Sequence, residues 1–276
     1  MSVDSQDLLS VATRAAREAA QFILGESSKR REVDFKGATD LVTQADRGSE
    51  EMILDRICRQ FPDHGILTEE SPGKPGDSPY TWIVDPLDGT TNFVHGYPFY
   101  AVSIAVYAGN NPVVGVIVDV PRGDIYRAAS GNGAYLSRGI SHQSPPDEEE
   151  TPISVSSTGN LEHTLLATGF PYVHDEIWSR NFDRFKAFTN RTQGVRRAGS
   201  AALDLAHVAR GWLDGFWEFG LHPWDTAAGV LLVSEAGGKV SLTDGTPFTL
   251  LDREIVASNG HVHAEMLKVF SSLRPS

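Results

Sequence analysis

Two aspartates lie three residues apart in residues 82–93, Trp-Ile-Val-Asp-Pro-Leu-Asp-Gly-Thr-Thr-Asn-Phe. The aromatic and β-branched residues 80–84 predict a strand. Pro86 cannot donate to a sheet ladder, so we expect the strand to end there. Asp85 and Asp88 would then lie at a strand end, where a loop can direct both carboxylates to one point.

The residues that follow these aspartates suit an anion. Gly89 lets the backbone approach a ligand closely, and residues 89–92 offer N–H groups and hydroxyls that suit a phosphate, especially if they open a helix. Two carboxylates beside them would repel a phosphate. A hard divalent cation resolves this conflict, because Mg²⁺ binds through carboxylates together with substrate phosphate. The stretch therefore predicts a metal-bridged phosphate site.

Three other interpretations of this stretch imply a different role. Asp-Gly alone is most often a turn, and Thr-Thr-Asn a helix cap. An aspartyl-phosphate phosphatase uses Asp-x-Asp-Gly-Thr, with its nucleophile two residues before the second acid, whereas the separation here is three. A calcium-binding EF-hand needs further oxygen ligands and a Glu at loop position twelve, and that pattern is absent. The whole stretch favours the metal-bridged site.

Acidic side chains at two earlier positions could join this site. Glu69 and Glu70 follow a short predicted strand within residues 65–71. Asp46 lies three residues after Thr43, on the same face of a predicted helix start. Taken singly, each acid is ordinary for a solvated strand end or a helix cap, so its assignment depends on the rest of the pattern.

The composition is that of an ordinary globular protein, with 276 residues, 40% of them hydrophobic, and a formal net charge of −12. No long Lys/Arg run is present, so we expect no nucleic-acid binding. An acidic protein acting on an acidic substrate again suggests metal ions as the local positive charge. The single cysteine, Cys58, excludes an intrachain disulfide framework. Without a membrane-length apolar run or a signal-peptide core, we expect a cytoplasmic protein with no membrane contact.

The first half of the chain predicts helices and then a meander of strands. Helices are expected at residues 5–25 and 40–59, with a polar loop between them that contains Lys36. Three strands bounded by Gly, Asn or Pro should then form an antiparallel meander. They lie at residues 100–107, 112–120 and 124–129.

Residues 142–151 are the clearest break in composition, rich in proline and acids. We interpret them as a surface link within a single catalytic domain, residues 1–276. The link would join an N-terminal lobe, about residues 1–141, to a C-terminal lobe, about residues 152–276. In the second lobe, helices are expected at residues 177–190, 200–209, 223–236 and 263–270, and strands at 165–168, 195–198, 216–218, 239–242 and 255–258. The aromatic residues of the first of these helices are expected in the core.

Four motifs together resemble the inositol monophosphatase family. Residues 85–92, Asp-Pro-Leu-Asp-Gly-Thr-Thr-Asn, resemble its first signature, and residues 224–229, Trp-Asp-Thr-Ala-Ala-Gly, its second. Residues 40–46 and 69–71 resemble two further motifs, and all occur in the family order. The resemblance implies an α/β fold, the layered αβαβα sandwich of the inositol monophosphatase and fructose-1,6-bisphosphatase type. It also implies a homodimeric, Mg²⁺-dependent and lithium-sensitive phosphatase.

The resemblance implies two to three Mg²⁺ ions and a role for each acid. The first ion would be bound by Glu69, Asp85, the carbonyl of Leu87 and Thr90, the second by Asp85, Asp88 and Asp225, and a third, weaker one by Glu69. Two departures from the family pattern are visible. Thr68 stands where many relatives have glycine, and Lys36 matches a family lysine only if one residue is deleted.

The resemblance also implies residues for substrate and water. Glu69, Thr90 and Asp46 would be catalytic, with Asp46 and Thr90 orienting or deprotonating the attacking water. The phosphate would bind to the amides of Gly89 and Thr90. The remaining substrate contacts would be Ala201, Glu218 and Asp225.

The substrate that this pattern favours is a small phosphorylated polyol, myo-inositol monophosphate, which would be hydrolysed to inositol and phosphate. Glu218, in Phe-Trp-Glu-Phe-Gly, is the acid expected to meet the inositol hydroxyls. The same chemistry on histidinol phosphate, fructose-1,6-bisphosphate or 3′-phosphoadenosine 5′-phosphate is the alternative, because fold and motifs do not settle substrate. A non-catalytic regulatory protein on this scaffold is a further rival, but it should have lost ligands, and all are present.

Overall fold

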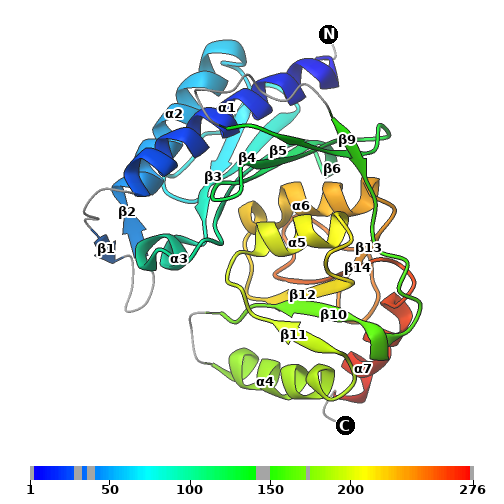
Figure 1. Cartoon of the computed structure of the whole chain (residues 1–276). Coiled ribbons are helices and arrows are strands. Elements are labelled where there is room, and N and C mark those ends of the chain that lie inside the picture. Colours follow the sequence, from blue (N-terminus) through cyan, green and yellow to red (C-terminus); the bar gives the residue numbers. More distant parts are fainter. Residues whose placement is uncertain (1–2, 28–32, 36–40, 141–149, 172–174, 274–276) are drawn as a thin grey trace.

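The computed structural model describes residues 3–27, 33–35, 41–140, 150–171 and 175–273. Within them, helices and sheets alternate in five layers (Figure 1). This is the αβαβα sandwich that the family resemblance implied. Lys36, Asp40 and most of the expected link, residues 142–149, lie outside the described residues.

The larger sheet has seven strands in the order β3-β4-β5-β6-β7-β8-β9. Only β3 and β4 are parallel, and every other neighbouring pair is antiparallel. The predicted meander is confirmed as β5, β6 and β7. The strands are β3 (Gly65–Thr68), β4 (Tyr80–Asp88), β5 (Ala101–Ala108), β6 (Asn111–Asp119), β7 (Asp124–Ala129), β8 (Ala134–Arg138) and β9 (Thr151–Ile153).

The prediction that the strand ends at Pro86 was wrong, because β4 continues to Asp88. Its register against β5 shifts there: Asp85 pairs with Ser103 but Asp88 pairs with Ala101, so three steps on β4 match two on β5. Pro86 lies in this bulge, where its missing N–H is tolerated. Residues three apart on a regular strand point to opposite faces. The extra residue brings both aspartates to the same side.

Two helices, α1 (Ser5–Ser27) and α2 (Gln44–Gln60), cover the outer face of the larger sheet. The inner face of α1 is rich in alanine and fully buried, so the helix packs closely on the strands. Residues 41–43 were expected to be helical but form strand β2 (Leu41–Thr43), paired with β1 (Val33–Phe35). The helix-start role expected of Thr43 is confirmed, since Thr43 and the third helical residue form a capping box.

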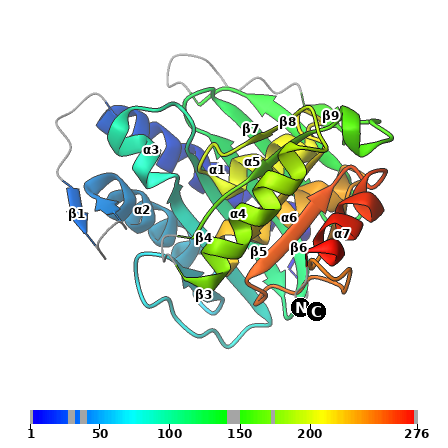
Figure 2. The same ribbon diagram turned by 90° about the horizontal axis from the view of Figure 1, so that it is seen from below.

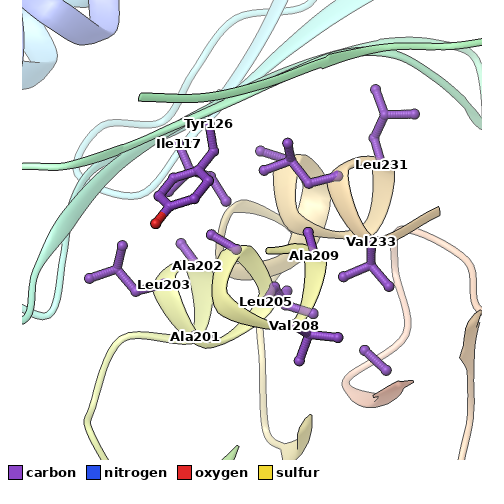
Figure 3. Packing of buried hydrophobic residues seen from close by; sticks show 14 of the residues in the cluster. Ile117, Tyr126, Ala201, Ala202, Leu203, Leu205, Val208, Ala209, Leu231 and Val233 are labelled. Carbon is purple, nitrogen blue, oxygen red and sulfur yellow. The ribbon is translucent and has the colours of Figure 1, made fainter. Parts of the chain in front are cut away.

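Two more helices, α5 (Ala201–Ala209) and α6 (Pro223–Glu235), form the central layer between the two sheets. Figure 3 shows side chains of the larger sheet, such as Tyr126, facing the apolar surface of these helices. The packing is close, because a Cβ at Gly115 on β6 would lie 2.9 Å from the carbonyl oxygen of Ala228 on α6. This central layer therefore fixes the two sheets relative to one another.

The smaller sheet has the strand order β11-β10-β12-β14-β13. Its central strands β10 and β12 are parallel, and β14 is antiparallel to its neighbours. Its outer face is covered by α4 (Glu176–Thr189) and α7 (His263–Ser272) (Figure 2). The strands are β10 (Leu165–Thr168), β11 (Gly194–Arg196), β12 (Gly215–Phe219), β13 (Lys239–Ser241) and β14 (Glu254–Ser258), and the short helices are α3 (Thr90–His95) and η1 (Leu161–His163).

The expectation that the aromatic residues of α4 belong to the core holds only in part. Phe188 is buried and stacks on Trp217, with ring centroids 4.3 Å apart. Phe182 is 47% exposed and packs instead on Phe170, outside the buried clusters. The helical period predicted that the aromatic residues of α4 share one face. They cover a wider part of the helix surface than the face that packs on the sheet, so some of them remain exposed.

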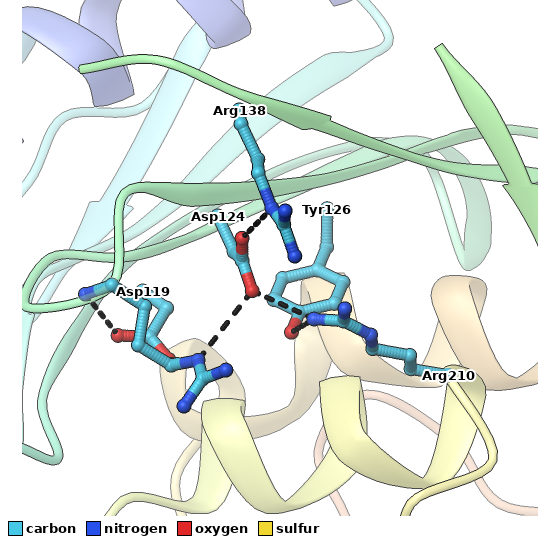
Figure 4. A network of polar contacts seen from close by, with 6 residues as sticks. Asp119, Asp124, Tyr126, Arg138 and Arg210 are labelled. Atoms are coloured by element: carbon cyan, nitrogen blue, oxygen red, sulfur yellow. Dashed lines mark hydrogen bonds and ion pairs between the residues drawn. The ribbon is translucent and has the colours of Figure 1, made fainter.

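A polar network around one buried carboxylate ties the end of α5 to the larger sheet (Figure 4). The carboxylate of Asp124, which is 2% exposed, accepts hydrogen bonds from Arg210 at 2.6 Å and from Arg138 at 3.0 Å. Arg210 also donates to the hydroxyl of Tyr126 at 3.1 Å. Because a buried carboxylate is costly without partners, this network favours one position of α5 against the sheet.

None of the helices in the described residues is both long and apolar enough to cross a membrane.

Candidate active site

A cavity of about 1230 Å³ opens where β4, α3, α5, α6 and β12 meet. The structure brings together at this cavity all but one of the predicted site residues. The residues lining it include Glu69, Asp85, Leu87, Asp88, Gly89, Thr90, Ala201, Glu218 and Asp225. Asp46 is the exception, because it is fully buried behind Thr90.

The acidic side chains act on one another across this cavity. Burial raises the pKa of Asp85 well above its usual value, and the charges of Glu69, Asp88 and Asp225 raise it further. The pKa of Asp225 is also raised well above its usual value by burial and then by Asp88. Asp225 begins α6, far along the chain from β4, so only the tertiary fold places these charges in contact.

Backbone and hydroxyl donors fix the aspartates. Asp88 accepts hydrogen bonds from the Ser200 hydroxyl at 2.6 Å and from the backbone N–H of Ala202 at 2.8 Å. Asp225 accepts the N–H of His222 at 2.6 Å. Burial nevertheless raises the pKa of Asp88 to about 6. Ser200, which also caps α5, was not predicted as a site residue.

The donor set fits a hard cation, although it does not form a closed cage. In the part of the chain that the structure describes, no three His, Cys, Asp or Glu side chains are grouped closely enough to hold a metal ion. The acids instead face one cavity as an open set of oxygen donors, and their mutual repulsion raises the pKa of Asp85. Oxygen donors of this kind suit Mg²⁺, and a divalent charge would relieve the repulsion.

Thr90 connects the cavity to the buried Asp46. Its hydroxyl donates to the Asp46 carboxylate at 2.8 Å and also lies 3.0 Å from the carbonyl oxygen of Leu87. The other carboxylate oxygen of Asp46 accepts the hydroxyl and the N–H of Thr43. Burial raises the pKa of Asp46, while these hydrogen bonds oppose the rise. Gly89, just before α3, has φ +91°, a conformation that favours glycine.

Helix α2 anchors both segments that carry the acids of the larger sheet, residues 68–70 after β3 and residues 85–90 at the end of β4. Asp46 accepts from Thr90, as described above, and Ser49 donates to the carbonyl oxygen of Pro86 at 2.8 Å. Glu50 accepts the Thr68 hydroxyl at 2.5 Å and the N–H of Glu70 at 3.0 Å. These two partners flank Glu69 in the sequence, so Glu50 fixes the backbone that carries it.

Ser49 and Glu50 were not predicted as functional residues, although a signal was present. They lie three and four residues after Asp46, on the same helical face. Both are buried, and polar side chains on a buried face need partners. Thr68, a departure from the family pattern, supplies one of those partners through its hydroxyl.

Glu218 lies at the second-sheet side of the cavity. Burial and the charge of Asp88 raise its pKa to about 8, and Arg197 opposes the shift. A Cβ at Gly169 would lie 2.1 Å from the Glu218 carboxylate, so a larger residue there would displace this side chain from its position. Buried Asp204 has a raised pKa through burial and then the charge of Glu218. Sequence reasoning missed Gly169 and Asp204, because their contacts join separate elements.

Comparison with known proteins gives a consistent result. The model of the inositol monophosphatase family matches residues 4–274. An inositol-1-monophosphatase of Synechocystis is 45% identical over 98% of this chain and 90% of its own length. The Nus factor SuhB of Escherichia coli is 41% identical over 94% of each chain. The solved structure of an inositol monophosphatase from Anabaena is similar with a TM-score of 0.82 and 41% identity, covering 98% of this chain and 97% of that one.

We predict that the stability of the metal-free protein falls as pH rises from about 4.5 to about 8, in part through Glu218. The folded state raises the pKa of this group from 4.5 to about 8, so across that window the unfolded state loses its proton more readily. Glu218→Gln stays neutral and should flatten the curve, by up to about 4 kcal/mol of unfolding free energy. Urea unfolding in chelator at several pH values measures this.

The matched control for this measurement is Glu162→Gln, since Glu162 is exposed. It should reproduce the wild-type dependence on pH. If the unfolding free energy of Glu218→Gln changed with pH in the same way as that of the wild type, the raised pKa of Glu218 would be contradicted.

Proposed function

Because the chain belongs to the inositol monophosphatase family and is a phosphatase, we propose that it hydrolyses a small phosphorylated polyol, myo-inositol monophosphate, with bound Mg²⁺. The observation that carries this proposal is the shared cavity of Asp85, Asp88 and Asp225, next to the Asp46–Thr90 pair. It supports a reaction in which an anionic ester is held by cations and attacked by water.

We assign the cation ligands as the resemblance implies. Glu69, Asp85, the carbonyl of Leu87 and Thr90 would hold one ion, Asp85, Asp88 and Asp225 a second, and Glu69 a third more weakly. When bound, these ions offset the charge of the phosphate and of the leaving alkoxide, and they acidify the attacking water. Their charge would also favour the ionised forms of the acids whose pKa values are raised.

The chain's own residues would orient the phosphate and the water. The hydroxyl of Thr90 donates to Asp46, which leaves its oxygen free to accept a hydrogen bond from a water in the cavity. As that water gives a proton to the Thr90 oxygen, the Thr90 hydroxyl would pass its own proton to Asp46, whose raised pKa makes it a better acceptor. The amides of Gly89 and Thr90, just before and at the start of α3, would bind the phosphate oxygens.

Glu218 and Ala201 would contact the alcohol part of the substrate. Both line the cavity from the side of the second sheet and α5. A carboxylate accepts hydrogen bonds from neighbouring hydroxyls, so an ester of a polyol suits Glu218 better than an ester of a plain alcohol. This contact is our reason to favour inositol monophosphate over the other small esters.

The proposed function is tested by phosphate release from a panel of esters with Mg²⁺ and with chelator. The panel contains inositol 1-phosphate, histidinol phosphate, fructose-1,6-bisphosphate and 3′-phosphoadenosine 5′-phosphate. We expect the highest kcat/KM for the inositol ester, loss of activity in chelator and inhibition by Li⁺. Asp88→Asn should lower kcat about 10²- to 10³-fold, since it removes charge stabilisation from the transition state.

Asp77→Asn, at an exposed position, is the control and should keep wild-type kinetics. A higher kcat/KM for another ester would replace the substrate assignment. Absence of release from every ester with Mg²⁺ would favour a non-catalytic protein on this scaffold.

We further predict that Glu50 is a positioning residue for Glu69. Glu50→Gln keeps the size of the side chain but weakens its two hydrogen bonds to Thr68 and Glu70. The Mg²⁺ concentration for half-maximal activity should rise about tenfold, as for outer-shell changes at metal sites. Glu51→Gln, the exposed neighbour, should leave it unchanged. A lower melting temperature with an unchanged Mg²⁺ requirement would show a structural role alone.

We also propose a homodimer formed through α4. Phe182 on this helix is 47% exposed and packs with Phe170 and Trp178 as one aromatic group, and exposed apolar patches mark contact sites. Phe182→Glu should then convert the dimer to a monomer in sedimentation velocity, because it would bury a charge at the contact. Leu251→Glu, at a position that is 77% exposed, is the control. An unchanged mass for Phe182→Glu would place the contact elsewhere or exclude it.

A further inference from the structure

A second cavity, of about 500 Å³, lies between α1 and the strands β7 and β8. It shares no lining residue with the catalytic cavity. Helix α1 covers the outer face of the larger sheet, whereas α5 and α6, which border the catalytic cavity, lie on its inner face (Figure 1). The volume of this second cavity lies within the range of about 300 to 1,000 Å³ that is common for small-molecule sites.

The charge of this cavity is opposite to that of the catalytic one. Arg14 and Arg17 reach it from α1, and Arg127 reaches it from β7. Among the described residues that line it, the one acidic side chain is Glu150, which forms an ion pair with Arg127. Three guanidinium groups therefore face one carboxylate, in a protein whose formal net charge is −12. Such a local excess of positive charge is costly without an anion.

Two of these arginines have unused hydrogen-bond donors. The Nε–H groups of Arg17 and Arg127 are buried and have no hydrogen-bond partner among the residues that the structure describes. The side chain of Arg127 is only 17% exposed, so its Nε does not reach open solvent. Burial lowers the pKa of Arg17, and the nearby charge of Arg127 lowers it further. Buried donors on charged groups usually have partners, so the pair indicates a ligand.

We propose that this cavity binds a phosphate group of a small molecule, as a second anion site that is separate from the catalytic cavity. Guanidinium groups match the oxygens of a phosphate in paired hydrogen bonds. Ser10, Asn132 and Tyr135 also line the cavity and add hydroxyl and amide donors. The site needs no cation, since its own side chains supply the positive charge. It is independent of the function proposed above.

Glu150 competes with such a ligand for Arg127. Its carboxylate already pairs with that guanidinium at the cavity, and two anions near the same arginine repel one another. Removal of its charge should therefore strengthen binding, whereas removal of an arginine should weaken it. These opposite effects distinguish a phosphate site from a cluster that only stabilises the fold.

The test uses isothermal titration of the full chain with inorganic phosphate in chelator, at constant ionic strength. Chelator removes the cations from the mainly acidic catalytic cavity. Because four arginines also line that cavity, the variants at Arg17, Arg127 and Glu150 assign the remaining binding to the second site. We expect affinity to fall about tenfold or more in Arg17→Met and in Arg127→Met, and to rise several-fold in Glu150→Gln. Arg59→Met and Glu162→Gln, at exposed positions, are the matched controls and should bind phosphate as the wild type does.

Two outcomes would overturn this proposal. One is that phosphate binding disappears in chelator, which would assign it to the catalytic cavity. The other is that none of the variants differs from the wild type in affinity for phosphate. In that outcome Glu150→Gln, which keeps all three arginines, binds no better than the wild type, and Arg17→Met and Arg127→Met bind no worse. Thermal melting of each variant shows whether a lost affinity reflects lost folding.

Discussion

Repulsion among buried carboxylates is the constraint on which the rest of the structure depends. Asp85 lies close enough to Glu69, Asp88 and Asp225 for their charges to raise its pKa, and burial raises it further. Side chains that repel one another separate unless rigid elements hold them. Here these elements are β3, the bulge of β4, and the first turn of α6. The favourable packing of the helices and sheets therefore offsets the repulsion and keeps the acids together.

The layers perform this task through a few polar contacts at their boundaries. From the outer layer, α2 uses Asp46, Ser49 and Glu50 to hold the segments around Thr90, Pro86 and Glu69. From the central layer, α5 uses Ser200 and the N–H of Ala202 to hold Asp88. Each contact places a donor or acceptor on a regular helix, where its position is fixed by the helix and not by a flexible loop. This explains why a site built on loops and strand ends is preorganised.

The sequence predicted the features that depend on local pattern. Hydrophobic period located the long helices, runs of strand-forming residues bounded by Gly, Asn or Pro located the meander, and Asp85 and Asp88 followed by the donors of residues 89–92 indicated phosphate chemistry. What it missed depends on partners far away in the chain. The bulge at Pro86 exists only against β5, and Glu50 acquires its role only from residues 18 and 20 positions away. A local rule for proline, or for a helical glutamate, contains no information about those partners.

The molecule therefore has two ways to accommodate an anion, and their difference follows from where the charges come from. Carboxylates outnumber arginines in the lining of the catalytic cavity, so in the function that we propose an ester dianion enters together with cations, which would supply part of the chemistry. The cavity between α1 and β7 is lined by guanidinium groups, which can bind a phosphate directly but offer no group that attacks it. Hydrolysis needs positive charge that stabilises the transition state as the phosphate ester bond breaks. Binding of a phosphate without reaction needs only fixed positive charge. Among the described cavities of this acidic protein, one is lined mainly by acids and the other mainly by arginines, so reaction and recognition are separated on opposite faces of one sheet.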